Sequence, residues 1–287
     1  MSWEFWALQF LNGLQYSMLL FLLSIGLTVI FGLLHFINLA HGALYMLGAY
    51  LGVSLATAFG FWGALALAPV GVTAIGAALY FTLIRRLRQA GPMNQVLVTF
   101  GLIFVFLDLV RLGWGDIALG LEAPALLAGT TAFFDLAYPT YRLFVIAVGA
   151  LVMGGLWLVL ARTQIGAMIR AGVENGPMAA TLGINVEQLF FAVFCVGCAL
   201  AGLAGVVAAP IFSATTGMGI SILIPTLIVV VIGGLGSLEG AILGSLVVGF
   251  IETLGAVLLP GAAAITSYVL LAAILLLRPQ GLIPARG

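Results

Sequence analysis

The stretch RTQIGAMIRAGVENGPMAATLGINVE, residues 162–187, is the one substantial polar interval between two long apolar segments on the arginine-rich side of the chain. The flanking segments, 141–161 and 188–209, are each about 20 residues long, which is the length that crosses a bilayer core of roughly 30 Å as a helix. Barrel strands are shorter and alternate in polarity, and these runs do not alternate. The stretch therefore predicts a polar connection between two membrane-spanning helices.

The composition assigns the rest of the chain to the membrane as well. The 287 residues are 64% hydrophobic and 6% charged, whereas soluble domains carry about 25% charged residues. The apolar runs predict an all-α polytopic integral membrane bundle with about eight to nine transmembrane segments. The predicted segments are 15–34, 41–59, 62–84, 95–112, 141–161, 188–209, 220–232, 240–259 and 262–277.

Two breaks and two loops define the organisation of the bundle. The polar break at 35–38 and the glycine-rich break at 233–237 are typical of broken or re-entrant helices, which occur at membrane depth where protein or water covers them. The long loops 113–140 and 162–187 are both below the roughly 40 residues at which independent folding becomes difficult. Residues 1–287 are therefore predicted to form a single transmembrane domain.

The residue types that are scarce or missing exclude several functions. The chain contains no lysine, and a Walker P-loop needs one to reach the nucleotide phosphates, so any ATP hydrolysis must occur on another polypeptide. Two histidines and no clustered carboxylates predict neither a metal site nor a cofactor. Nine basic and nine acidic residues balance, so net charge implies no nucleic-acid partner. The N-terminal residues lack the basic region of a signal peptide, and the first segment is expected to remain uncleaved.

Arginine placement predicts the orientation in the membrane. Cytoplasmic loops are enriched in basic residues, and most arginines fall after segments 62–84 and 141–161 or in the C-terminal tail. They are Arg85, Arg86, Arg88, Arg162, Arg170, Arg278 and Arg286. The opposite side collects Glu4, Asp116, Glu122 and Asp135. The N-terminus is therefore predicted outside and the C-terminus in the cytoplasm.

Small residues recur at four-residue spacing, which lets helix backbones approach closely in lipid. Examples are Gly197, Ala201 and Gly205, then Gly48 and Gly52, and Gly240 and Gly244. We expect ordinary packing within the chain, with an interface to a second membrane subunit as the alternative. Cys195 and Cys198 are interpreted as small residues on adjacent turns of one helix face rather than as a redox pair.

Polar side chains within the apolar segments are candidates for a transport pathway, because such residues are costly in lipid. Asn38 and His41 border the break after the first segment and are candidate gate residues. The structural alternative is that a backbone carbonyl of the broken turn satisfies the histidine. The weakly polar residues expected to line a cavity between segments 15–34, 41–59, 188–209 and 220–232 are Ser24, Thr28, Thr215 and Thr216.

Three charged residues also lie within predicted segments. Asp108 and Arg111 have the i, i+3 spacing that places them side by side on one helix face, which predicts a buried, neutralising contact. Glu252 lies near the middle of segment 240–259 and is a third buried charge. A proton-coupled secondary transporter would need such a carboxylate, so that class of protein is an alternative.

Four passages taken together resemble one transport family. They are GLTVIFGLLHFINLAHGALYMLGAY (26–50), RAGVENGPMAATLGI (170–184), ALAGLAGVV with GGLGSLEGAILGSLVVG (199–207 and 233–249), and LRPQGL (277–282). Over nearly its whole length the chain is similar to the permease subunits of ABC importers for branched-chain amino acids, of the LivH type. The resemblance implies a bacterial inner-membrane permease for hydrophobic amino acids, with urea or short amides as the alternative substrates. The implied partners are cytoplasmic ATPase subunits, a homologous second permease or a second copy of this chain, and a periplasmic substrate-binding protein.

The resemblance also implies that 162–187 docks on the ATPase through a short coupling helix at 176–182. Pro177 is tolerated in the first turn of such a helix, where Glu174 and Asn175 would serve as dipole partner and cap, and Gly183 would end it. The predicted coupling residues are Arg170, Glu174, Asn175, Ala179, Ala180 and Gly183. Asn175 stands where the family often has an acidic residue, and an ordinary cytosolic connection is the alternative.

Two further classes of function fit the sequence poorly. The chain contains no H-E-x-x-H and no paired catalytic aspartates, and Ser237 has no basic partner nearby in the sequence. An intramembrane enzyme is therefore not supported, and no catalytic residue is predicted. A simple channel would have no evident use for the polar interval at 162–187.

Overall fold

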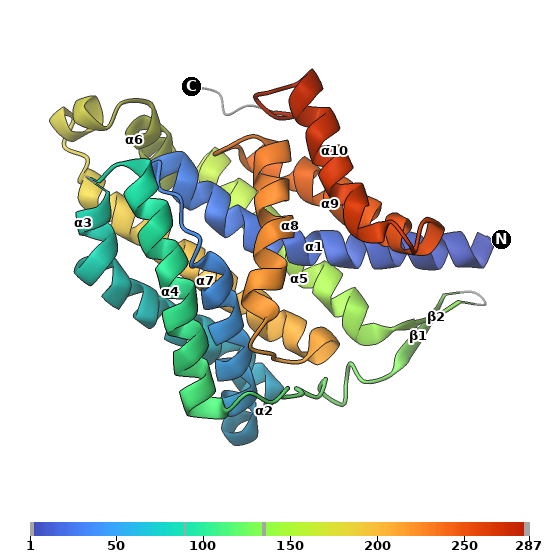
Figure 1. Cartoon of the computed structure of the whole chain (residues 1–287). Coiled ribbons are helices and arrows are strands. Elements are labelled where there is room, and N and C mark those ends of the chain that lie inside the picture. The colour runs from blue at the N-terminus through green and yellow to red at the C-terminus, as the bar shows by residue number, and fades with distance from the viewer. Residues whose placement is uncertain (1–2, 89, 134–135, 284–287) are drawn as a thin grey trace.

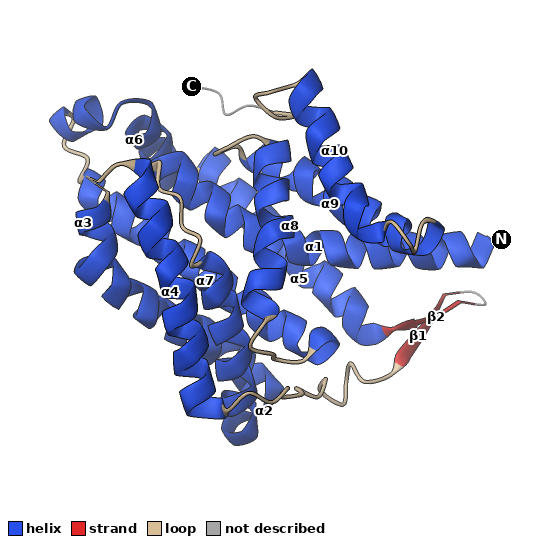
Figure 2. Cartoon of the chain, viewed as in Figure 1, coloured by secondary structure: helices blue, strands red, loops and turns tan. Residues whose placement is uncertain are grey.

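The computed structural model describes residues 3–88, 90–133 and 136–283, and its regular structure is almost entirely helical (Figures 1 and 2). The elements in chain order are α1 (Trp3–Leu34), α2 (His41–Leu79), η1 (Tyr80–Ile84), α3 (Arg85–Leu87), α4 (Pro92–Trp114), β1 (Thr130–Phe133), β2 (Leu136–Pro139), α5 (Thr140–Arg162), α6 (Gln164–Thr181), α7 (Val186–Phe212), α8 (Met218–Gly233), α9 (Leu238–Leu258) and α10 (Ala263–Leu277). The two short strands form an antiparallel hairpin. Asp135 and Arg286, which contributed to the predicted orientation, lie outside the described residues.

The predicted all-α polytopic membrane bundle is confirmed. Among the described residues, six helices are long and apolar enough to cross a membrane, and the continuous helical stretch 41–87 counts as one of them. The helices α8 and α10 are apolar but shorter. Most predicted segment ends lie close to the observed helix ends, and the exception is α1, which begins at Trp3 instead of near residue 15.

Hydrogen bonding explains why α1 begins earlier than its apolar run. The side chain of Asn12 interrupts the hydrophobic pattern, but its Oδ1 accepts hydrogen bonds from Tyr138 Oη at 3.2 Å and Arg142 Nη1 at 2.6 Å. Both donors come from the β2–α5 junction. The polar residue is therefore satisfied by tertiary contacts that a hydropathy pattern does not contain.

The first helix is the centre of the bundle. In α1, 83% of the most apolar window is buried within the chain, and α1 contacts α5, α7, α8 and α9. Close backbone approaches explain how several helices fit around it: Gly149 lies against Met18, and Gly249 lies against Ser17. A central helix surrounded on all sides explains why α1 is apolar around its whole circumference.

The long element α2 reverses direction at Gly60. This glycine has φ 69° and ψ 175°, which is not helical and interrupts the element. Leu51 on the first half contacts Gly71 on the second half, and Gly202 of α7 lies beside both Gly48 and Pro69. The two halves therefore lie side by side as a helical hairpin, in agreement with the two segments predicted at 41–59 and 62–84.

The small residues predicted to mediate close packing do so within the chain. A Cβ on Gly48 would lie 2.5 Å from the Gly202 carbonyl oxygen, and a Cβ on Gly205 would overlap the Tyr45 carbonyl. Gly240 and Gly244 make the same kind of approach to α8. In lipid, van der Waals contact of this kind holds helices together, and it binds α7 to the α2 hairpin.

The bundle has two differently built ends (Figure 1). We call the end that carries α6 the α6 side and the end that carries the β1–β2 hairpin the β side. Glu187 at the start of α7 contacts Arg85 and Arg88 on the α6 side. On the β side, Leu119 pairs with Ala214 in an isolated antiparallel bridge, which ties the loop after α4 to the α7–α8 connection.

Candidate functional site

The polar interval 162–187 folds as a two-part helix on the surface of the α6 side. The first part begins at the cap Thr163, whose hydroxyl accepts from Gly166 N at 3.3 Å. The helix is interrupted at Asn175, which has φ −153° and ψ 88°. The Asn175 Oδ1 accepts from Met178 N at 2.9 Å, so this residue caps the second part.

The second part ends at Gly183 in a Schellman motif. Gly183 has φ +86°, Ile184 N donates to Ala179 O at 3.1 Å, and Gly183 N donates to Ala180 O at 3.0 Å. These two bonds satisfy carbonyls that the last helical turn leaves free. The helix predicted at 176–182 is present, with its predicted cap and its predicted terminating glycine. The sequence did not reveal that 164–174 is helical too.

One predicted coupling residue faces the wrong way for its assigned contact. Ala179 is 2% exposed, so it packs against the bundle and is not available to another protein. The large apolar side chains exposed on the same short helix are Met178, at 56%, and Leu182, at 71%. Ala179 is therefore corrected to a packing residue. The exposed coupling candidates are Arg170, Glu174, Asn175, Ala180 and Gly183.

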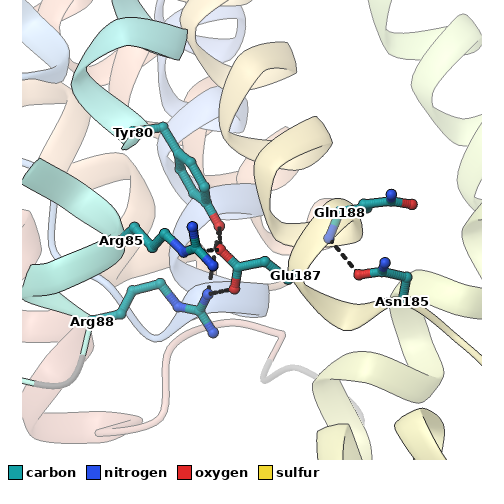
Figure 3. Close-up of polar contacts among 6 residues, drawn as sticks. All are labelled: Tyr80, Arg85, Arg88, Asn185, Glu187 and Gln188. Atoms are coloured by element: carbon teal, nitrogen blue, oxygen red, sulfur yellow. Dashed lines mark hydrogen bonds and ion pairs between the residues drawn. The ribbon is translucent and has the colours of Figure 1, made fainter. Parts of the chain in front are cut away.

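An ion-pair cluster joins the start of α7 to η1 and α3, which continue the α2 hairpin (Figure 3). Glu187 Oε2 lies 2.8 Å from Arg88 Nη1, and Glu187 Oε1 lies 3.2 Å from Arg85 Nε. Tyr80 Oη donates to Glu187 Oε1 at 3.0 Å. The carboxylate also lies in the first turn of α7, where the helix dipole favours negative charge.

The base of this cluster is aromatic. The Arg88 guanidinium carbon lies 3.9 Å from the centre of the Phe190 ring, within the range of a cation–π contact. Tyr80 packs against Phe191 and Phe194 of α7. In the sequence alone, Arg85 and Arg88 indicate only orientation in the membrane. Glu187, an acidic residue in the same group of arginine-rich loops, was the signal that could have predicted the cluster.

The break after α1 places two buried polar side chains in the interior. His41 Nε2 lies 3.1 Å from Leu23 O, so this nitrogen is the one that donates. The acceptor is a carbonyl of α1, whereas the structural alternative placed it in the broken turn. Asn38 Oδ1 and His41 Nδ1 are buried without a hydrogen-bond partner among the described groups. His35, in the same break, has φ 49°.

The four weakly polar pathway candidates fall into two separate groups. Ser24 and Thr28 are buried in α1, and the Ser24 hydroxyl bonds back to Phe21 O at 3.3 Å. Thr215 and Thr216 lie in the α7–α8 connection on the β side. The Thr216 hydroxyl donates to Asp116 Oδ1 at 2.6 Å.

The pair Asp108 and Arg111 is present, but it is not buried within the chain. The two groups are 3.6 Å apart, and their side chains are 71% and 45% exposed. The prediction of a buried contact is therefore wrong, because α4 lies at the edge of the bundle with this face uncovered. Arg111 Nε also lies 3.6 Å from Asp116 Oδ1. The Thr216 hydroxyl and the Arg111 guanidinium hold the pKa of Asp116 below its ordinary value of 3.8.

Glu252 is half-buried in α9, and its Oε1 accepts a hydrogen bond from Ser267 Oγ of α10 at 2.9 Å. It borders a cleft of about 350 Å³ between α8, α9 and α10. This cleft contains none of the other predicted pathway residues. The structure therefore separates the candidates into a surface helix, an interior break, a β-side loop contact and the Glu252 cleft.

These features define a multi-pass helical membrane protein with a buried non-helical break between α1 and α2 and a capped helix exposed at one end. The family described as the branched-chain amino acid transport system permease component matches residues 9–278. The chain belongs to this family, and the resemblance of the four sequence passages is confirmed.

Curated relatives cover almost the whole chain. The permease protein BraD of a high-affinity branched-chain amino acid transport system in Pseudomonas aeruginosa is 29% identical over 96% of this chain and 94% of its own length. The corresponding LivH of Escherichia coli K12 is 28% identical over the same shares. A probable LivH of the archaeon Methanocaldococcus jannaschii is 29% identical over 94% of this chain and 90% of its own. No solved structure matches the chain.

Proposed function

We propose that this chain is the permease subunit of an ABC importer that moves branched-chain or other hydrophobic amino acids across the bacterial inner membrane. The observation that carries the proposal is the family match over residues 9–278. The absence of lysine from the sequence supports a division of labour in which ATP is hydrolysed on separate subunits. The chain itself acts as a conduit and has no catalytic role.

The exposed second part of α6 is the proposed contact with the cytoplasmic ATPase. Its cap at Asn175 and its termination at Gly183 make it a short helix of defined length. Met178 and Leu182 are exposed apolar side chains on it, and burial in a cleft of another protein would be favourable for them. The helix lies directly between α5 and α7 in the chain, so its displacement would pull on both.

Movement of α7 would reach the interior through two connections. The Glu187 cluster attaches the start of α7 to the end of the α2 hairpin, and the glycine contacts attach the two elements along their length. The hairpin begins at His41, beside the interior break. In the proposed mechanism the ATPases close on nucleotide, α6 moves with them, and the segments around the break open alternately to the two sides of the membrane.

The remaining components follow from the class of transporter. The proposal includes a homologous second permease or a second copy of this chain, and a periplasmic binding protein that delivers the substrate to the β side. The α6 side then faces the cytoplasm, with the C-terminus. Arg85, Arg88, Arg162 and Arg170 on the α6 side support this orientation.

The test is uptake of radiolabelled leucine by proteoliposomes that contain the chain with its ATPases and binding protein. We expect uptake that requires ATP inside the vesicles and persists after an ionophore collapses the proton gradient. Uptake that stops with the ionophore and ignores ATP would overturn the proposal in favour of a proton-coupled transporter. Competition by valine, isoleucine, urea and acetamide then defines the substrate.

A further inference from the structure

The cleft beside Glu252 combines one carboxylate with an apolar wall. Its volume of about 350 Å³ lies at the small end of the range for small-molecule sites. The lining residues are Ser221, Ile224, Pro225, Ile228, Glu252, Ala256, Ser267 and Tyr268. The cleft reaches the surface of the chain, since Ile224 is 43% and Tyr268 is 51% exposed. Its volume and lining suit a small ligand that is charged at one end and apolar along the rest.

The Glu252 carboxylate is held in place by neighbours that carry no positive charge. Ser267, which is 3% exposed, donates to Glu252 Oε1 at 2.9 Å, and Tyr16 of α1 also interacts with the carboxylate. The sequences of α1, α8, α9 and α10 contain no arginine, lysine or histidine. Among the described residues, no ion pair involves Glu252.

A carboxylate within a membrane segment is costly, and such a group usually pairs with an opposite charge. The chain supplies hydroxyl donors and no cation, so a positive ligand would complete the site. A metal ion would need more than one anionic ligand or several carbonyl oxygens, and the apolar part of the lining, Ile224, Pro225, Ile228 and Ala256, offers no side-chain ligand. An alkyl ammonium group satisfies the carboxylate and the apolar wall together.

We propose that the cleft between α8, α9 and α10 binds the ammonium group of an amphiphilic primary amine, with Glu252 as its counter-ion and Ser267 as the residue that positions Glu252. The ammonium can come from an amino acid in transit or from the headgroup of an aminophospholipid. The amino-acid source deepens the proposed transport function and rests on it. The binding of the ammonium itself does not depend on ATP or on the partner subunits.

The experiment measures binding to the full-length chain in nanodiscs of phosphatidylglycerol, a lipid without an amine. The probe is 3-methylbutylamine, and its carboxylate counterpart, 4-methylpentanoate, tests the sign of the charge. We expect the amine to bind and the carboxylate to bind at least about tenfold more weakly, since charge-assisted hydrogen bonds are the strong ones. Equal binding of the two probes would overturn the proposal.

The variants Glu252→Gln and Ser267→Ala test the residues. Glutamine keeps an oxygen that can accept from Ser267, so the helix contact survives while the charge is lost. We expect amine binding to weaken about tenfold or more in Glu252→Gln and less in Ser267→Ala. The matched control is Glu239→Gln, the same substitution at an exposed position in the first turn of α9, and it should bind as the unmodified chain does. Unchanged binding in Glu252→Gln contradicts the assignment.

Competition identifies the source of the ammonium. Displacement of the amine by leucine supports an amino-acid substrate as the source of the ammonium group. Displacement by phosphatidylethanolamine added to the nanodiscs supports the lipid headgroup as the source. Failure of both to displace the probe would overturn a physiological role for the cleft. Because no ATPase is present in this assay, its outcome is independent of the ATP-driven uptake that tests the transport function.

Discussion

At the scale of single residues, Glu187 connects α7 to the segment that follows the α2 hairpin on the α6 side. It bonds Tyr80 of η1 and pairs with Arg85 of α3 and with Arg88, the residue that follows α3. The partners are unequal, because the Arg88 side chain is 21% exposed and the Arg85 side chain is 59% exposed. Solvent screens the more exposed pair strongly, so most of the energetic contribution is expected from Arg88.

The substitution Glu187→Gln is expected to lower the free energy of unfolding by about 1 kcal/mol, because exposed ion pairs contribute little each and one of these is partly shielded. The measurement is denaturant unfolding of the purified chain in detergent. The control is Glu174→Gln on the exposed face of α6, which should change the value little. An equal loss in the two variants would assign the effect to net charge rather than to the cluster.

Asp116 predicts a pH dependence on the β side. Because its pKa is lowered by Thr216 and Arg111, its folded-state contribution is fully present above the ordinary carboxyl pKa of 3.8 and is lost as the pH falls through the lower folded value. The unmodified chain should exceed Asp116→Asn in thermal stability at neutral pH, and the difference should shrink below about pH 4. A difference that stays constant with pH would contradict this assignment.

At the scale of elements, the second part of α6 depends on its cap. Asn175→Ala removes the acceptor for Met178 N and is expected to cost about 1 kcal/mol of local helix stability. Faster hydrogen exchange of the amides at 176–182 and slower ATP-driven uptake are the expected results. Asn175→Asp retains a cap oxygen and should restore the slow exchange. If uptake is normal in a variant whose amides at 176–182 have lost all protection from hydrogen exchange, the helix is excluded as the coupling element.

The packing of α7 on the α2 hairpin depends on the absence of a side chain at particular positions. A methyl group on Gly205 would overlap the Tyr45 carbonyl, and overpacking of this kind costs about 1–3 kcal/mol. Gly205→Ala should therefore lower stability in a denaturant titration. Gly101→Ala on α4 is the matched control, since nothing lies within 4 Å of a Cβ built there. Because alanine has the higher helix propensity, Gly101→Ala should not lower stability. Comparable losses in both variants would show that the contact with Tyr45 is not the cause.

The sequence was sufficient to predict where the helices lie, but it was insufficient to predict most of the contacts between them. Apolar runs located the spans, and the chemistry of Asn175, Pro177 and Gly183 located the second part of α6, because local rules determine both. The early start of α1 was missed because Asn12 is satisfied by residues more than a hundred positions away. The helix at 164–174 was missed because its polarity was interpreted as a loop.

The candidate site residues divide in the same way, into features that local rules predict and contacts that only the fold determines. Burial depends on what covers a helix face, so the sequence could not show that Ala179 packs inward or that Asp108 and Arg111 are exposed. Pairing across the bundle was only partly accessible from the sequence. The acidic Glu187 indicated that a basic partner was needed, but its contact with Arg88 and the contact of Thr216 with Asp116 came only from the fold. Glu252 was recognised as an unusual carboxylate, but its cleft is formed by three helices together.

At the scale of the whole molecule, the proposed orientation can be tested with an impermeant maleimide. Leu126, 82% exposed, lies in the loop that leads to β1, and Met178, 56% exposed, lies on α6. Intact cells of a Gram-negative host with a permeabilised outer membrane should label Leu126→Cys, and Met178→Cys should require lysis. The unmodified chain, with both cysteines inside α7, is the control. The reverse pattern would place α6 outside the cytoplasm, where a cytoplasmic ATPase could not bind it.

The central position of α1 has a consequence for biogenesis. Ser17 Oγ lies 3.4 Å from Leu246 O of α9, a separation of 229 residues in the chain. At a synthesis rate of about 5–20 residues per second, α1 waits roughly 10–45 s in the bilayer before its partner leaves the ribosome. During that interval the polar atoms of Gln15 and Ser17 face lipid, the translocation machinery or a chaperone. The helix that enters the membrane first is thus among the last to reach its native surroundings.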